Sequence, residues 1–227
     1  MDSVSAVVFD LDGTLLDSQG GIVKAFQRTF EELGLAPAPD DEEIVAQIGL
    51  AFDAMLQGMG RPLPPDELAR FVATYRRHYW EIAPRMSPPF EGVPELLAEL
   101  ARMKERLPGL AVGVATNKRS PMAQHILDHL RLSRYLDVVQ GLEDGLEPKP
   151  APDLLLRALE RVGARPGQAL FVGDTEGDLR AARAAGTRSC LAAYGYGASA
   201  VPPDLVPDLR IGRPQDLLRW LQAHLAA

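Results

Sequence analysis

The feature that most constrains the fold is a short apolar run that ends in two carboxylates near the start of the chain. Residues 6–9 (AVVF) are entirely apolar, which predicts a buried strand. Asp10 and Asp12 follow it directly, and Gly13 then permits a tight turn. Open α/β sheets bind their ligands at the carboxyl ends of their strands. We therefore expect a ligand site at this point.

Asp10 and Asp12 repel each other at close range unless a cation lies between them or one of them is protonated. A bound Mg²⁺ with a phosphate is the simplest arrangement that relieves this repulsion. Taken alone, the pair also fits a turn with two solvated carboxylates. The choice between these interpretations depends on the rest of the chain.

Two kinds of pattern follow along the chain. Residues 18–89 show apolar residues at helical spacing and no strand. From residue 90 onward, helical stripes alternate with apolar runs near residues 110–115, 137–140, 169–172, 188–192 and 209–211. Such alternation predicts a parallel sheet with helices on both faces. We predict an α/β protein in which residues 1–17 and 90–227 form a Rossmann-like, doubly wound parallel sheet core, with an inserted all-helical cap domain at 18–89.

Several details of the helices are also predicted. Asp66 is expected to cap the longest helix of the insertion, which should end near Pro84. Tyr75, Tyr79 and Trp80 are expected in the core of the insertion. A hinged insertion of this kind is typical of a lid that closes over a site.

Further polar residues are expected where the later strands end. They are a Thr-Asn-Lys run, one lysine and two aspartates: Thr116, Asn117, Lys118, Lys149, Asp174 and Asp178. Parallel topology brings these strand ends to one edge of the sheet, together with Asp10 and Asp12. Carboxylates for a cation, a hydroxyl and amide for phosphate oxygens, and an ammonium are what phosphoryl transfer requires.

Lysine usage supports this interpretation independently. Only four of the 24 basic residues are lysine, at positions 24, 104, 118 and 149. A chain that otherwise uses arginine has therefore kept a compact ammonium at both Lys118 and Lys149.

Four motifs resemble those of the haloacid dehalogenase superfamily. They are FDLDGTL at 9–15, ATNK at 115–118, KP at 149–150, and VGDT at 172–175 with Asp178. Within the superfamily, IGL at 48–50, PFEGV at 89–93 and EPKPAPD at 147–153 are similar to phosphoglycolate-phosphatase-like members. The motifs occur in the expected order and span nearly all of the predicted sheet domain.

The resemblance implies catalytic roles. Asp10 would be the nucleophile that forms an aspartyl-phosphate, and Asp12 would act as general acid and then as general base. Mg²⁺ would be held by the Asp10 carboxylate, the Asp12 backbone carbonyl and Asp174, with Asp178 bound through a metal water. Lys149 would neutralise charge between Asp10 and the phosphate.

The resemblance also implies binding roles. Thr116 and Asn117 would hold phosphate oxygens. Lys118 either contacts the substrate or its phosphate, or is a solvated loop lysine. Gly49 in the insertion would allow close backbone approach to the substrate.

Departures from the motifs separate the branches of the superfamily. Dehalogenases and phosphonate-cleaving members lack the second acid, whereas Asp12 is present here. The phosphonate-cleaving members also use a lysine in the insertion, where this chain has only Lys24. Hexose-phosphate mutases carry a histidine where Ile22 stands. The three differences favour a hydrolase.

Composition excludes other classes of partner. A net charge of −7 argues against a general nucleic-acid binder, and no apolar run approaches the roughly 20 residues that span a bilayer. The N-terminus does not resemble a secretory signal, and a single cysteine, Cys190, fits a cytoplasmic location. A monomer and a homodimer are both compatible with the sequence.

The predicted function is a Mg²⁺-dependent phosphatase that hydrolyses small phosphorylated metabolites, with phosphoglycolate as the leading substrate. A pyrophosphatase or nucleotidase with the same machinery is the alternative enzyme. A non-catalytic sensor of phosphorylated metabolites is the alternative of another class.

Overall fold

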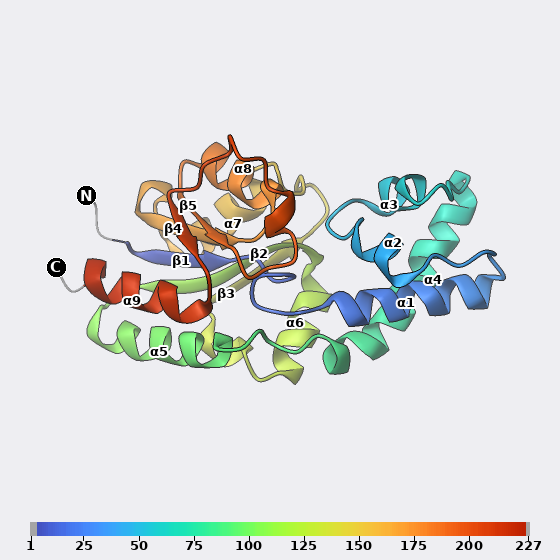
Figure 1. The fold of residues 1–227 in the computed structure, drawn as a ribbon. Helices are drawn as coiled ribbons and strands as arrows, with labels where there is room; N and C mark the ends of the chain where they lie inside the picture. Colours follow the sequence, from blue (N-terminus) through green and yellow to red (C-terminus); the bar gives the residue numbers. More distant parts are fainter. Residues whose placement is uncertain (1–3, 226–227) are drawn as a thin grey trace. The chain divides into compact units, whose positions relative to one another are not determined.

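The computed structural model describes residues 4–225, which form two compact units (Figure 1). One unit contains residues 4–17 and 89–225, and the other is Ser18–Pro88. The first unit contains every strand of the described chain, whereas the regular elements of the second are all helices. Among residues 4–225, no helix is both long enough and apolar enough to cross a membrane.

The first unit is built on a six-stranded parallel sheet in the order β3-β2-β1-β4-β5-β6. The strands are β1 (Ala6–Phe9), β2 (Ala111–Arg119), β3 (Val138–Leu142), β4 (Ala169–Gly173), β5 (Arg188–Ala192) and β6 (Leu209–Ile211). The predicted α/β, doubly wound, Rossmann-like architecture is therefore confirmed.

Helices cover both faces of this sheet. Figure 1 shows α5 (Val93–Arg106), α6 (Ser120–His129) and α9 (Pro214–Leu225) on one face, and α7 (Asp153–Val162) and α8 (Glu176–Ala185) on the other. The order in which the chain adds strands reverses at β1. Strands β2 and β3 lie on one side of β1, whereas β4, β5 and β6 lie on the other. Such a switch point is where open α/β sheets bind ligands.

Strand β1 lies at the centre of the unit because it is apolar on both faces. All four of its residues are buried. Ala6 and Val8 pack with Leu155 of α7 and Phe171 of β4 in one core cluster. Phe9 is in register with Val114 of β2 and Val172 of β4, so the residues that follow these positions lie at the same edge of the sheet.

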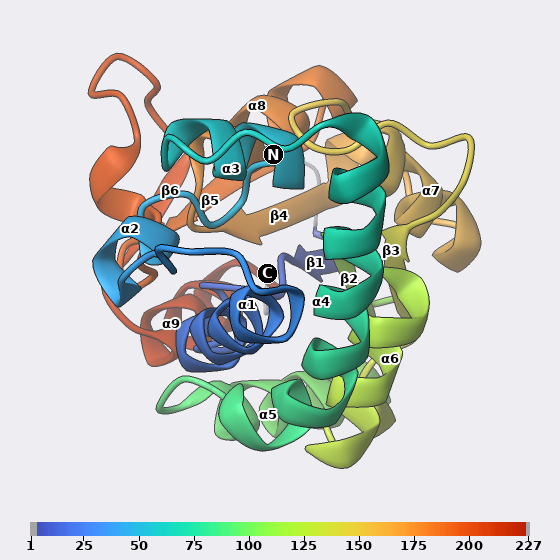
Figure 2. The same cartoon turned by 90° about the vertical axis from the view of Figure 1, so that its right-hand side faces the viewer.

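The second unit has an aromatic core. Its helices are α1 (Gln19–Leu33), α2 (Asp41–Val45), α3 (Phe52–Gly58) and α4 (Pro65–Met86). Figure 2 shows α1 beside α4, and Phe26 of α1 lies 5.4 Å from Phe71 and 5.0 Å from Tyr75 of α4 between ring centroids. These edge-on and tilted ring contacts are the favoured geometries for aromatic pairs.

The longest helix of this unit differs from its prediction. Pro64 occupies the N-cap position of helix α4, and the helix begins at Pro65. Asp66 therefore lies in the first turn instead of capping the helix. Proline is favoured at the first helical position because its missing N–H has no partner there. The helix also continues past Pro84 to Met86, so this proline lies inside its last turn. Tyr75 and Tyr79 are buried as predicted, but Trp80 is 44% exposed.

The second strand also differs from its prediction. Strand β2 extends to Arg119, through the Thr-Asn-Lys run that was predicted to follow its end. Its pairing with β3 shifts register between Ala115 and Arg119. The polar run therefore lies on an irregular strand end, and this irregularity has no signature in hydrophobic periodicity.

Candidate active site

The turn after β1 is fixed by backbone hydrogen bonds. The Asp10 N–H donates to the Val172 carbonyl at 2.8 Å, which extends the pairing of β1 with β4 by one residue. Gly13 has φ of +86° and its N–H donates to the Leu16 carbonyl at 2.8 Å. A left-handed conformation of this kind favours glycine. The turn therefore holds Asp10 and Asp12 at the edge of the sheet.

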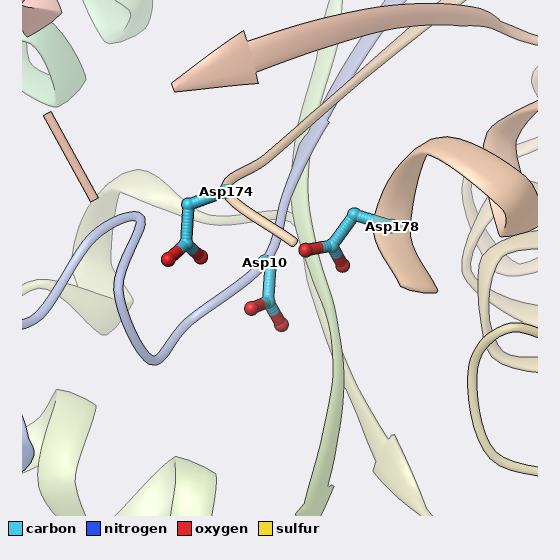
Figure 3. A group of neighbouring side chains, drawn as sticks. All are labelled: Asp10, Asp174 and Asp178. Carbon is cyan, nitrogen blue, oxygen red and sulfur yellow. The ribbon is translucent and has the colours of Figure 1, made fainter. Parts of the chain in front are cut away.

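Three buried carboxylates converge beside this turn. Asp10 follows β1, Asp174 follows β4, and Asp178 lies in the first turn of α8. One carboxylate oxygen of each residue lies within 4.8 Å of those of the other two, and Figure 3 shows the three side chains grouped together. The residues predicted to share a cation are therefore close enough to do so.

Asp178 is oriented by the start of α8. Thr175 caps this helix, and its hydroxyl accepts the Asp178 N–H while donating to Asp178 Oδ2 at 2.6 Å. The Thr175 N–H also donates to that Oδ2 at 2.9 Å, completing a capping box. A Cβ at Gly173 would overlap the Asp178 carboxyl group, so this glycine is required by close approach.

Lys149 lies between two of the carboxylates. Its Nζ donates to Asp10 Oδ1 at 2.5 Å and to Asp178 Oδ1 at 2.6 Å, and its side chain is only 5% exposed. Burial alone would lower the pKa of Lys149, but the attraction of Asp10 and Asp178 outweighs burial and raises that pKa. The ammonium therefore stays charged.

The backbone of Lys149 is held by Asn117. The Lys149 N–H donates to Asn117 Oδ1 at 2.8 Å, and Asn117 Nδ2 donates to the Lys149 carbonyl at 3.2 Å. This two-way bridge joins the end of β2 to the loop before α7. Asn117 thus positions the buried lysine, whereas the sequence suggested only a contact with phosphate.

Asp174 is fully buried and has a hydrogen bond to each carboxylate oxygen. The Thr14 hydroxyl donates to Oδ1 at 3.1 Å, and the Gly197 N–H donates to Oδ2 at 2.8 Å. Burial, with repulsion from Asp178 and Asp10, raises the pKa of Asp174 to about 8. Burial likewise raises the pKa of Asp10 to about 7 against the attraction of Lys149.

The cluster therefore has more negative than positive charge when ionised. Three buried carboxylates surround one buried ammonium, which leaves two uncompensated negative charges. Burying unpaired charge is costly, so the carboxyl groups either take up protons or bind a cation. All the candidate ligand atoms are carboxylate oxygens, which suit hard divalent cations such as Mg²⁺, Ca²⁺ or Mn²⁺. The residues present fit a metal ion site.

Asp12 belongs to a second ion pair at the same edge. Its Oδ2 lies 3.0 Å from Nζ of Lys118, with the two side chains 19% and 9% exposed. Asp12 is thus more accessible than Asp10, while its negative charge also raises the pKa of Asp10.

Comparison with known proteins agrees with this geometry. The sequence profile of the haloacid dehalogenase-like hydrolases matches residues 7–192. The chain is 35% identical over 219 residues to a phosphoglycolate phosphatase of Aquifex aeolicus, covering 96% of this chain and 97% of that protein. The chain belongs to the haloacid dehalogenase-like hydrolase family. It is also 34% identical over 216 residues to a phosphoglycolate phosphatase of Escherichia coli K12, covering 86% and 83% of the two chains.

Solved structures of haloacid dehalogenase-like proteins share the whole fold. A hydrolase of this family from Streptococcus pneumoniae superposes with a TM-score of 0.83 at 30% identity, over 98% of this chain and all of that one. A predicted phosphoglycolate phosphatase from Haemophilus somnus gives a TM-score of 0.84 at 26% identity, over 97% and 99% of the two chains.

The other motif residues of this haloacid dehalogenase-like hydrolase are placed as follows. Thr116 is buried in β2, and its hydroxyl accepts the Lys118 N–H at 3.2 Å. Gly49 lies in the helical unit with φ of +103°, and a Cβ there would meet no atom within 4 Å. A phosphate role for Thr116 and a substrate role for Gly49 stay predictions.

Three contributors to the site were not singled out from the sequence. Thr14 and Thr175 lie within recognised motifs but contribute through hydroxyl groups that orient Asp174 and Asp178. Gly197 contributes through its backbone N–H. A lone glycine in a loop that follows β5 has no local pattern that predicts such a contact.

Proposed function

We propose that this phosphatase hydrolyses phosphoglycolate, with Asp10 as the nucleophile and Mg²⁺ as the cofactor. The observation that carries the proposal is the buried contact of Lys149 Nζ with Asp10 Oδ1 at 2.5 Å, inside a cluster of three carboxylates. The substrate is supported by two relatives named phosphoglycolate phosphatase at 34–35% identity.

The proposed metal ligands are the side chains of Asp10 and Asp174, the backbone carbonyl of Asp12, and Asp178 through a bound water. When bound, Mg²⁺ supplies positive charge that lowers repulsion between the nucleophile and the phosphate. Two uncompensated negative charges in the cluster support a divalent ion. Hydrogen bonds from Thr175 to one oxygen of Asp178, and from Lys149 to the other, support an indirect role for this residue.

In the first step, an Asp10 oxygen attacks phosphorus and the bond from phosphorus to the ester oxygen breaks. Asp12 gives its proton to that departing oxygen. Thr116 and Asn117 are proposed to hold the phosphate oxygens, while Lys149 offsets their charge. The buried ammonium also favours the ionised Asp10 that attack requires, against the effect of burial.

In the second step, Asp12 takes a proton from a water molecule, which attacks phosphorus. The bond between phosphorus and Asp10 then breaks, releasing inorganic phosphate and restoring the carboxylate. Lys118 is proposed to fix the orientation of Asp12 in both steps, which its Nζ supports by lying 3.0 Å from Asp12 Oδ2.

The two units are proposed to divide the work. Residues 1–17 and 90–227 are assigned as the catalytic core, and residues 18–89 as a cap domain that selects the substrate. Gly49 is proposed to lie on the selecting loop of the cap, and a Cβ at this position would meet no atom within 4 Å. We further propose that the enzyme is monomeric or homodimeric and lies in the cytoplasm. The buried Cys190 thiol, which forms no disulfide, supports the cytoplasmic location.

The test is release of inorganic phosphate from a panel of phosphoglycolate, sugar phosphates, nucleotides and pyrophosphate. The purified full chain is assayed with Mg²⁺ and again after treatment with EDTA. We expect the highest kcat/KM with phosphoglycolate and loss of turnover in EDTA that added Mg²⁺ restores. A higher kcat/KM with pyrophosphate or a nucleotide would replace the substrate assignment, and binding without phosphate release would indicate a sensor.

A further inference from the structure

The loop of residues 194–197 (YGYG), between β5 and the short 3-10 helix Ala198–Ala200, contacts two parts of the active site. At one end, the Tyr194 hydroxyl donates to the Thr14 carbonyl at 2.8 Å. At the other end, the Gly197 N–H donates to Asp174 Oδ2 at 2.8 Å. We call this segment the 194–197 loop. It joins the turn after β1 to the end of β4.

Close packing explains both glycines of the loop. A Cβ at Gly195 would overlap the Asp174 side chain and the Gly13 carbonyl oxygen. A Cβ at Gly197 would lie 2.8 Å from Thr175 Cγ2 and 3.0 Å from Asp174 Oδ2. Neither glycine has a left-handed backbone, so the requirement comes from space and not from conformational freedom. The backbone of the loop thus lies directly against Asp174.

The contacts restrain the Asp174 carboxylate from both sides. Thr14 donates to Oδ1 and Gly197 donates to Oδ2, while Tyr194 holds the Thr14 backbone. The Tyr194 ring is itself held by Phe90, with ring centroids 5.3 Å apart. Each carboxylate oxygen has two lone pairs, so one hydrogen bond to each oxygen leaves both able to bind a cation.

We propose that the 194–197 loop is a positioning element that orients Asp174 toward the bound metal ion. This inference rests on the proposed metal site. Groups that hydrogen-bond to metal ligands fix the orientation of those ligands, and their loss typically weakens metal binding by about 10- to 100-fold. The Gly197 N–H donates to Asp174, a proposed metal ligand and not the proposed nucleophile, so we expect the loop to act on metal affinity more than on the chemical step.

The test is metal binding by the purified, metal-free full chain without any substrate. Isothermal titration with MgCl₂, repeated with MnCl₂, is compared between the wild type, Gly197→Ala and Tyr194→Phe. The matched control is Gly167→Ala, because Gly167 is exposed, has no left-handed backbone, and would place its Cβ within 4 Å of no atom. Circular dichroism in EDTA establishes that each variant is folded.

We expect Gly197→Ala to raise the dissociation constant by about 10- to 100-fold. Tyr194→Phe removes one hydrogen bond and should raise it by about 5-fold. Gly167→Ala should bind like the wild type. In the phosphatase assay, both loop variants should need more Mg²⁺ for half-maximal rate yet approach the wild-type kcat at saturating Mg²⁺.

Equal metal affinity in Tyr194→Phe and the wild type would overturn the proposal, even if Gly197→Ala fails to fold. A fall in kcat that excess Mg²⁺ does not restore would also overturn it. If the wild type binds the metal but does not hydrolyse phosphoglycolate, only the substrate assignment fails. If the wild type binds neither cation, both the cofactor and the positioning role are rejected.

Discussion

The Lys118 ammonium lies 3.0 Å from Asp12 Oδ2, and the two side chains are shielded from most solvent. A general acid must hold its proton at one place relative to the leaving oxygen. This ion pair gives Asp12 a fixed partner on the neighbouring strand. Lys118 therefore has two candidate roles, which are to orient Asp12 and to bind the substrate, and kinetic measurements can distinguish them.

The first prediction concerns this lysine. Lys118→Met should lower kcat by about 10- to 100-fold with little change in KM, because Asp12 loses the partner that orients it. Steady-state kinetics with phosphoglycolate measures both constants. Lys24→Met is the control, since Lys24 is exposed on α1. A raised KM with unchanged kcat would assign Lys118 to substrate binding instead.

The second prediction concerns the nucleophile. Asp10→Asn should reduce turnover by more than about 1000-fold, because an amide cannot form the aspartyl-phosphate. The circular dichroism spectrum should match that of the wild type. Asp53→Asn, a change in the first turn of α3, is the control and should keep full activity. A residual rate above about one thousandth of the wild type would rule out covalent catalysis by Asp10.

The third prediction concerns the metal-free protein. Burial raises the pKa of Asp10 to about 7 and that of Asp174 to about 8, from 3.8 in both cases. Between pH 4 and pH 8 the folded chain therefore holds more protons than the unfolded chain, so stability falls as pH rises. Urea unfolding in EDTA should show a loss on the order of a few kcal/mol from pH 5 to pH 8.

One further measurement, made with Mg²⁺, tests this explanation. The carboxylates of Glu32, Glu43 and Asp216 have lowered pKa values, so their contribution to folding stability changes only below pH 5. They therefore do not mask the fall in stability between pH 5 and pH 8. Saturating Mg²⁺ should raise stability most at pH 8, where the cation replaces the protons. Stability that is constant or rises between pH 5 and pH 8 in EDTA would contradict the raised pKa values.

The fourth prediction concerns the single cysteine. Cys190 is fully buried in β5, and burial raises the pKa of its thiol to about 12. Because the thiolate is the reactive form, the folded protein should react with an aromatic disulfide reagent at pH 8 far more slowly than the urea-unfolded protein does. Absorbance of the released thiolate measures the rate. Equal rates in the two states would show that β5 opens readily.

Most of the fold followed from the sequence because apolar periodicity and strand alternation are local. The run at residues 6–9 and the polar residues after it place Asp10 correctly, and the parallel topology brings Asp174 to the same edge. Errors arose where local signals compete. At the start of α4, Asp66 is a favourable cap residue, but proline is favoured at the first helical position. The helix therefore begins at Pro65, one residue before Asp66.

Much of the support around the site could not be predicted in the same way. The bridge between Asn117 and the Lys149 backbone lies in the segment of β2 where its pairing with β3 shifts register. The contact of Gly197 with Asp174 depends on a backbone N–H, which every non-proline residue has. Such contacts join positions far apart in the sequence and leave no pattern within either segment.

The central place of β1 has a consequence for how the enzyme is made. This strand leaves the ribosome before its two neighbours in the sheet, which begin at residues 111 and 169, and the donor to Asp174 Oδ2 is residue 197. Contacts of such long range form late in folding. During synthesis Asp10 is therefore exposed long before the other carboxylates can lie beside it, and the hydrogen bonds to Asp174 are complete only after residue 197 has been made.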